Sequence, residues 1–242
     1  MVCEFSETQF VVGILTELIN NCWKPGRAWT SPRIPTQKKE KEKGYDFTIK
    51  GAVRTLFFQF KVPEKKTTKK GKYWEEFKEP YYEFKIWPDS LTHQHNELVD
   101  LAKADPRNRV YYCSPGFHTF EEFDKNYTDR MIARKSIYVP CAALPKISGN
   151  DKHDISYTFK SKKRIYKMHS QEFEIQAFDI EELKADVENA VSYENIHTCL
   201  ASIAEIFSID IKNVESDMER FDKIADYLLM HKNLNMLLLG EC

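Results

Sequence analysis

Apolar positions in the first half of the chain alternate between a helical and a strand period. The first segment has a stripe with helical spacing, formed by Phe10, Val11, Ile14, Leu15, Leu18 and Ile19. Ser6 followed by Gln9 resembles a capping box, so a helix is predicted to begin there. Two apolar segments further along, 45–49 and 55–62, predict adjacent strands joined by a hairpin at Gly51.

The alternation continues with more strands and a second helix. Residues 81–87 predict a strand that ends at a proline, and Ser90 begins a helix with apolar members at helical spacing. Short strands are predicted at 109–113 and 136–140, with a helical or irregular insertion at 117–134 between them. Strands that alternate with helices in this way predict an α/β fold.

The last third of the chain is acidic and helical in period. Helices are predicted from Phe178 onward, at about 196–207 and at 218–239. We therefore expect an α/β core at residues 1–145 and a mainly helical C-terminal extension at 146–242 that packs on the core or on a partner. The apolar run that ends the chain fits either an exposed association surface or a core helix.

The amino-acid composition is typical of a folded protein with one main hydrophobic core. The chain has 242 residues, 42% of them hydrophobic, which is enough to bury a core without disulfides. Its six cysteines are scattered without a Cys-x-x-Cys pair, and the N-terminal half shows no secretory signal. Since no apolar run approaches the ~20 residues that span a bilayer, we expect a cytoplasmic protein with reduced thiols and no membrane partner.

A formal net charge of −1 conceals a strong asymmetry along the chain. Residues 38–85 hold fourteen Lys or Arg against eight Asp or Glu, and residues 171–242 hold five against sixteen. A positive field is what a polyanionic substrate requires, because phosphate contacts supply most non-specific nucleic-acid affinity. Aromatic residues among these lysines fit base stacking or a buried face. The lysines fit either nucleic-acid binding or a solvated loop, and they are Lys65, Lys66, Lys69, Lys70 and Lys72.

A candidate site follows from the strand period at 55–62. Alternate side chains of a strand point to one face, so Gln59 and Lys61 emerge together while Phe58 and Phe60 point to the other face. A hairpin would bring the carboxylate of Asp46 beside them. An acid, an amide oxygen and an ammonium on one face suit a divalent metal and a phosphate. Charged residues on the solvent face of a hairpin are the plainer interpretation.

The first helix adds a further candidate ligand. Glu17 lies beside the apolar stripe, and a carboxylate at the margin of a buried face is a candidate metal ligand, although an exposed flank position explains it too. Glu7, in the first turn, is a weaker candidate because an acid there simply favours the helix N-terminus.

Other chemistries are less well supported. His93 and His95 are two residues apart and do not share a helical face, and Cys113 with His118 lacks a second pair, so a zinc site is not expected. Ser114 is not part of a Gly-x-Ser-x-Gly motif, which argues against a serine hydrolase.

The order of these motifs resembles a known family. Glu17 in a first helix, Asp46, then Gln59-Phe60-Lys61 on a strand, and Gln94 in the following helix resemble the PD-(D/E)XK nuclease superfamily over about residues 6–115. The form resembled is the variant with Gln where the superfamily usually has Asp or Glu, seen in many nuclease effectors of bacterial antiphage defence. The resemblance implies a restriction-endonuclease-like mixed sheet flanked by helices, and hydrolysis of nucleic-acid phosphodiesters with Mg²⁺ or Mn²⁺.

The resemblance also implies roles for the matching residues. Asp46 would be the principal metal ligand together with Glu17, and Gln59 and the carbonyl of Phe60 would be supporting ligands. Lys61 would orient or deprotonate the attacking water. Because an amide contributes no charge, the metal would bind more weakly than in a site with three acids.

For Gln94 the family pattern implies a contact with DNA or a role in holding the site together. The lysines Lys65, Lys66, Lys69 and Lys70 are the expected nucleic-acid contacts.

The sequence therefore predicts a metal-dependent endonuclease that acts on DNA in antiphage defence or restriction. The alternative is a catalytically inactive, nuclease-like subunit that binds nucleic acid or scaffolds a defence complex. A third hypothesis is an RNase toxin, since no motif distinguishes DNA from RNA. A partner subunit or a second copy of the chain is expected to associate through the C-terminal helices.

Overall fold

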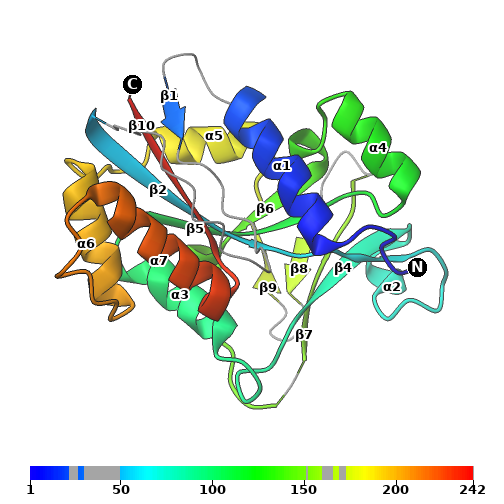
Figure 1. Ribbon diagram of the computed structural model, residues 1–242. Helices are drawn as coiled ribbons and strands as arrows, with labels where there is room; N and C mark the ends of the chain where they lie inside the picture. The colour runs from blue at the N-terminus through cyan, green and yellow to red at the C-terminus, as the bar shows by residue number, and fades with distance from the viewer. Residues whose placement is uncertain (22–26, 30–49, 151, 160–165, 169–172, 242) are drawn as a thin grey trace.

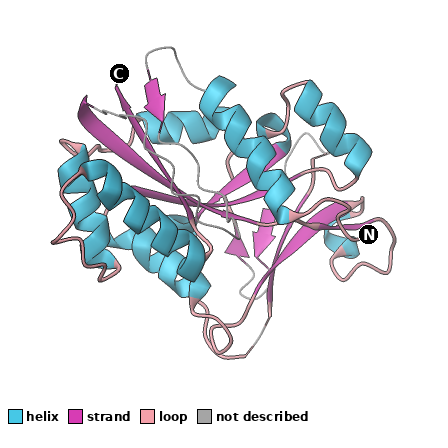
Figure 2. Ribbon diagram, viewed as in Figure 1, coloured by secondary structure: helices cyan, strands magenta, loops and turns pink. Residues whose placement is uncertain are grey.

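A computed structural model describes residues 1–21, 27–29, 50–150, 152–159, 166–168 and 173–241 (Figure 1). These residues form two five-stranded sheets with helices around them, which confirms the α/β class (Figure 2). The first sheet contains, in spatial order, β1 (Arg27–Trp29), β10 (Asn235–Glu241), β2 (Lys50–Phe60), β5 (Asn108–Pro115) and β6 (Ser136–Pro140). The second contains β3 (Glu64–Lys66), β4 (Tyr81–Ile86), β7 (His153–Tyr157), β8 (Tyr166–Met168) and β9 (Phe173–Glu174). The described helices are α1 (Glu7–Asn21), α2 (Trp74–Phe77), α3 (Gln94–Ala104), α4 (Phe120–Thr128), α5 (Ile180–Glu188), α6 (Ile196–Ile206) and α7 (Asp217–Lys232), with 3-10 turns η1 (Ala133–Lys135) and η2 (Cys141–Ala143).

The first sheet is mixed. Strand β2 runs parallel to β5 and antiparallel to β10, and β6 is antiparallel to β5. Helix α3 lies between β2 and β5 in the chain and packs on the sheet, as expected for the connection of two parallel strands. The second sheet is antiparallel throughout and joins the first through the same core, since Phe84 of β4 and Tyr157 of β7 belong to the cluster that contains α3.

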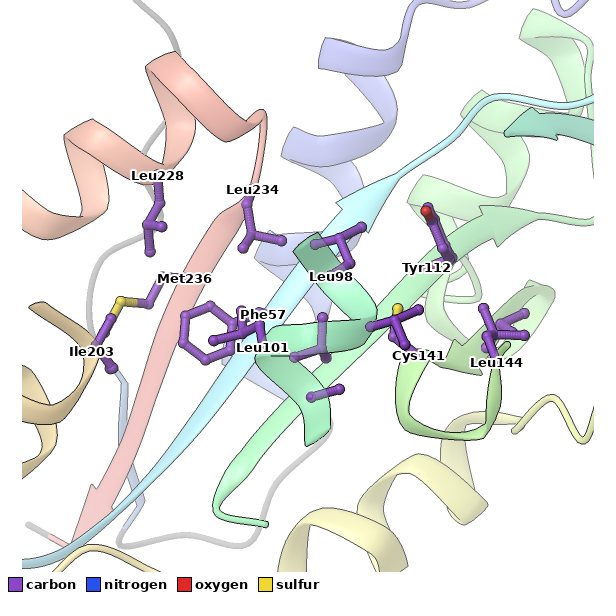
Figure 3. Packing of buried hydrophobic residues seen from close by; sticks show 14 of the residues in the cluster. Phe57, Leu98, Leu101, Tyr112, Cys141, Leu144, Ile203, Leu228, Leu234 and Met236 are labelled. Carbon is purple, nitrogen blue, oxygen red and sulfur yellow. The ribbon is translucent and has the colours of Figure 1, made fainter. Parts of the chain in front are cut away.

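Helices cover both faces of the first sheet because its central strands are apolar on both sides. On β2, Leu56, Phe58 and Phe60 pack with α1 and α5 in one cluster. Val53 and Phe57, at the alternate positions, pack with α3, α6 and α7 in another. Figure 3 shows this second core, with Phe57 among Leu98 and Leu101 of α3, Leu228 of α7 and Met236 of β10. A polar side chain on β2 is therefore held between buried layers.

Several predicted elements are confirmed near their expected ends. Ser6 caps α1, because its hydroxyl accepts from the Gln9 amide N–H at 3.1 Å and its own N–H donates to the Gln9 side chain at 3.0 Å. Strand β6 spans the predicted 136–140, and α4 occupies part of the insertion at 117–134. Among the described cysteines, Cys3, Cys113, Cys141 and Cys199 are free thiols. None of the helices in the described ranges is long and apolar enough to cross a membrane.

The predicted hairpin at Gly51 is wrong. Strand β2 continues through Gly51 from Lys50 to Phe60, and its antiparallel neighbour is β10 from the far end of the chain. Gly51 has a φ of +76° and lies where the pairing of the two strands shifts register between Leu239 and Glu241. The positive φ of Gly51 therefore allows an irregularity within the strand and does not reverse the chain.

The predicted helix at 218–239 is also wrong over its last part. Helix α7 ends at Lys232, Asn233 adopts the left-handed conformation with a φ of +48°, and the remaining residues form β10. The apolar run is buried on both faces of the sheet: Leu237 packs with α1, whereas Met236 packs with α7. Each of the two sheets consequently holds strands from both sides of the expected boundary at residue 145.

Candidate functional site

Gln59 and Lys61 lie at the carboxyl end of β2, where this strand runs beside the parallel β5. Phe58 and Phe60 point into the α1 cluster, as the strand period predicted. Gln59 has 0% exposure, and Lys61, the first residue after the strand, is half-buried. The carboxyl ends of parallel strands are the usual place for ligands in α/β sheets.

Gln94 meets Gln59 from the first turn of α3. Its Nε2 donates to Oε1 of Gln59 at 2.7 Å and to the backbone oxygen of Lys232 at 2.8 Å. Nε2 of Gln59 in turn donates to the backbone oxygen of Phe60 at 3.3 Å. The structure thus brings together the two glutamines of the predicted motif, which are separated by 35 positions in the chain.

Lys61 lines a cavity of about 230 Å³ between the end of β2 and strand β4. Its ammonium forms no ion pair within the described part of the chain, because no carboxylate oxygen there lies within 4.0 Å. Burial lowers the pKa of Lys61, and the negative charge of Glu7 opposes this by raising it. The other lining residues are Glu7, Val62, Glu64, Glu83, Phe84, Lys85 and Trp87.

Glu7 is the acid that the structure places beside Lys61. It lies in the first turn of α1, and its Oε1 accepts a hydrogen bond of 3.3 Å from Nδ2 of Asn233. The sequence ranked Glu7 below Glu17. The sequence offered one signal for Glu7, its position one turn before Phe10. The structure explains why that position matters, because the ring of Phe10 packs 5.8 Å from that of Phe60, beside Lys61.

Glu17 lies elsewhere. Its side chain is on the α1 side of the first sheet, with 6% exposure, and its Oε2 accepts from the backbone N–H of Ala133 at 3.2 Å. Burial raises the pKa of this carboxyl, and hydrogen bonds from the backbone of Ala133 and Ile132 oppose the rise. Glu17 is therefore a buried acid that satisfies the start of η1, on the sheet face opposite to α3. Asp46 lies outside the described residues.

The lysines of the basic segment differ from one another. Lys66 is engaged by Glu64 at 2.6 Å and Glu83 at 3.0 Å, so its charge is largely compensated. Lys65 lies over the ring of Tyr82 at 5.4 Å. Lys69 and Lys70 are exposed. The last two are the ones placed to meet a polyanion directly.

Four of the five aromatic residues of this segment face the interior, and the fifth, Trp74, is half-buried. Tyr73, Phe77, Tyr81 and Tyr82 are all at most 7% exposed, so they form core instead of a stacking surface. Trp87 is different, because it is 45% exposed and lines the cavity that contains Lys61. Its exposed ring can stack on a base, and no pattern in the sequence distinguished it from the other aromatic residues.

His95 is satisfied within the core. Its two ring nitrogens lie 3.0 Å from the Tyr112 hydroxyl and 2.9 Å from the backbone oxygen of Pro145, and burial lowers the pKa of the imidazole. A neutral ring that donates to Pro145 and accepts from Tyr112 meets both contacts.

Comparisons with protein-family models, with curated proteins and with solved structures gave no match for this chain.

Proposed function

We propose that this protein is a metal-dependent nuclease that hydrolyses phosphodiester bonds, with DNA as the substrate and antiphage defence or restriction as the setting. The observation that carries the proposal is the hydrogen bond from Gln94 to Gln59 at the carboxyl end of the parallel pair β2 and β5, two residues before Lys61. The mixed sheet flanked by helices supports it at the level of fold class.

In this proposal Lys61 acts on the scissile phosphate. A half-buried ammonium without a carboxylate partner in the described residues has little competition for an anion. Charge placed where the transition state develops negative charge is the strongest single contribution to such catalysis. Trp87, exposed on the same cavity, would stack on a neighbouring base, and Lys69 and Lys70 would contact the backbone.

Mg²⁺ or Mn²⁺ remains part of the proposal through Asp46. Within the described ranges no group of three or more His, Cys, Asp or Glu side chains gathers in a way that could hold a metal ion. Glu17 is engaged at η1, and the Gln59 oxygen already accepts from Gln94. The described residues do not form a metal site by themselves, so the proposed cofactor depends on what Asp46 contributes.

The hydrogen bonds of Glu17 with η1 and of Gln59 with Gln94 favour a second candidate function. A nuclease-like subunit that binds nucleic acid or scaffolds a complex without cleavage needs Lys61 and the surrounding lysines but no metal ligands. The hydrogen bonds that occupy Glu17 and Gln59 fit that candidate better than an open metal site.

The test is cleavage of plasmid, linear duplex, single-stranded DNA and RNA by the full chain with Mg²⁺, Mn²⁺ or a chelator. The nuclease predicts metal-dependent cutting of DNA that Asp46→Ala abolishes. Binding without cutting in every metal condition would point to the second candidate. Cutting restricted to RNA would replace DNA as the substrate.

A further inference from the structure

Lys232, the last residue of α7, and Asn233, which follows it, touch the candidate site from the opposite end of the chain. These two residues are called the α7–β10 turn. Its contacts reach back to Gln94 over 138 positions and to Glu7 over 226 positions. Figure 1 shows α7 beside α3, with β10 returning into the sheet next to β2. The turn therefore sits where three separate parts of the site converge.

The backbone oxygen of Lys232 decides how the two glutamine amides are oriented. A carbonyl only accepts hydrogen bonds, so Gln94 must turn its NH₂ group toward Lys232. The same NH₂ group is 2.7 Å from Gln59, and Gln59 must therefore present its oxygen to α3. Its own NH₂ group is then left for the Phe60 carbonyl. The orientation of each amide follows from that single acceptor.

The Lys232 carbonyl is available because it belongs to the last turn of a helix. The final carbonyls of an α-helix have no partner within the helix and carry its negative partial charge. Gln94 supplies the missing donor. The Lys232 side chain adds an ion pair, with its Nζ 2.6 Å from Oε1 of Glu97 one turn further along α3. Two contacts thus fix α3 to the end of α7.

Asn233 makes the second connection. It holds the left-handed conformation that ends α7, and Nδ2 of the same residue donates to Glu7 at 3.3 Å. Glu7 and Lys61 line one cavity. Asparagine is one of the few residues that tolerate a positive φ, but glycine ends a helix at least as well. The hydrogen bond from the Asn233 amide to Glu7 is therefore not needed to end the helix.

We propose that the α7–β10 turn is the positioning element of this site: Lys232 orients Gln94 and, through it, Gln59, while Asn233 holds Glu7 against the Lys61 cavity. Gln94 is then a positioning residue and not a nucleic-acid contact. The effect of the α7–β10 turn on catalysis rests on the proposed nuclease function. The orientation of the two glutamine amides does not depend on that function.

Side-chain amide spectra of the ¹⁵N-labelled full chain test the orientation without any assay of cleavage. Both Nε2 protons of Gln94 are expected to exchange with solvent at least tenfold more slowly than those of exposed Gln176. Gln59→Glu keeps an acceptor and should preserve this protection. Gln59→Met, which keeps the volume if a buried carboxylate is not tolerated, should release one of the two protons. Exchange of Gln94 as fast as that of Gln176 would overturn the proposal.

Cleavage kinetics test the role of Asn233. Asn233→Gly preserves the helix end and removes the contact with Glu7, so kcat should fall about tenfold with KM and melting temperature unchanged. Lys78→Gly is the matched control, since Lys78 also caps a helix with a positive φ of 52° and is exposed. An unchanged kcat in Asn233→Gly would refute the role of Asn233. Protected Gln94 protons in a protein that cleaves nothing would refute the nuclease and leave the positioning intact.

Discussion

Leu237→Ala should destabilise the protein strongly, because β10 is an internal strand and not a surface helix. Leu237 has 0% exposure, is opposite Leu56 in the register of β10 with β2, and packs in the α1 cluster. Removal of three fully buried carbons costs about 0.8 kcal/mol each, and the cavity that remains brings Leu→Ala losses to about 3 to 5 kcal/mol. At this chain length such a loss lowers the melting temperature by roughly 10 °C.

Leu91→Ala is the matched control for this prediction. The chemistry is the same, but Leu91 is 67% exposed, so its truncation should change the free energy of unfolding by less than about 0.5 kcal/mol. Urea and thermal unfolding of both variants, followed by circular dichroism, give the comparison. If Leu237→Ala were as stable as Leu91→Ala, the C-terminal run could not be the buried strand described above.

Two other predictions concern charged groups. Hydrogen bonds from Arg107 hold the pKa of Asp105 below its ordinary value, so their contribution to stability is complete above about pH 4 and is lost as pH falls through the lower folded-state pKa. Unfolding measured from pH 5 to pH 2 should show this acid loss in the wild type and a smaller one in Asp105→Asn. Glu17→Gln should leave cleavage unchanged, because an amide oxygen still accepts from η1, whereas Glu7→Gln should lower kcat about tenfold. Steady-state kinetics of Glu17→Gln and Glu7→Gln provide the measurement. A larger loss of kcat in Glu17→Gln than in Glu7→Gln would contradict the placement of the two acids.

Local patterns predicted several of the described elements in the first 140 residues because the signals are themselves local. The cap of α1, the strand at 136–140 and the two-faced alternation of Phe58, Gln59 and Phe60 all depend on neighbours in sequence. A period of two on a strand fixes which side chains share a face whatever the strand pairs with. Gln59 and Lys61 could therefore be placed together before any fold was known.

The C-terminal strand could not be predicted in this way. The run from Leu234 to Leu239 is rich in leucine and lacks β-branched residues, so its intrinsic preference is helical. Its strand conformation comes from pairing with β2, almost two hundred positions earlier in the chain. Asn233, directly after the basic residues His231 and Lys232, was a local sign of a helix end. The hairpin predicted at Gly51 was wrong for a related reason, because the antiparallel partner of β2 is β10 at the far end of the chain.

The candidate site was predictable only in part. Gln94 was selected from motif order, and its contact with Gln59 is a tertiary one. Glu7 and Asn233 meet across the whole chain, and no pattern in the sequence joins them. Glu17 was a better candidate by helical spacing alone, yet its carboxylate is held by Ala133 on the other face of the sheet.

The role of Lys61 is tested by comparing Lys61→Met with Lys125→Met in single-turnover cleavage and in nucleic-acid binding on the same DNA. Methionine keeps the apolar stem of lysine, and Lys125 is an exposed lysine on α4. Lys61→Met is expected to lose at least about 100-fold in the cleavage rate, with affinity changed less than about threefold and Lys125→Met like wild type. Equal cleavage by the two variants would contradict the assignment of the site to Lys61.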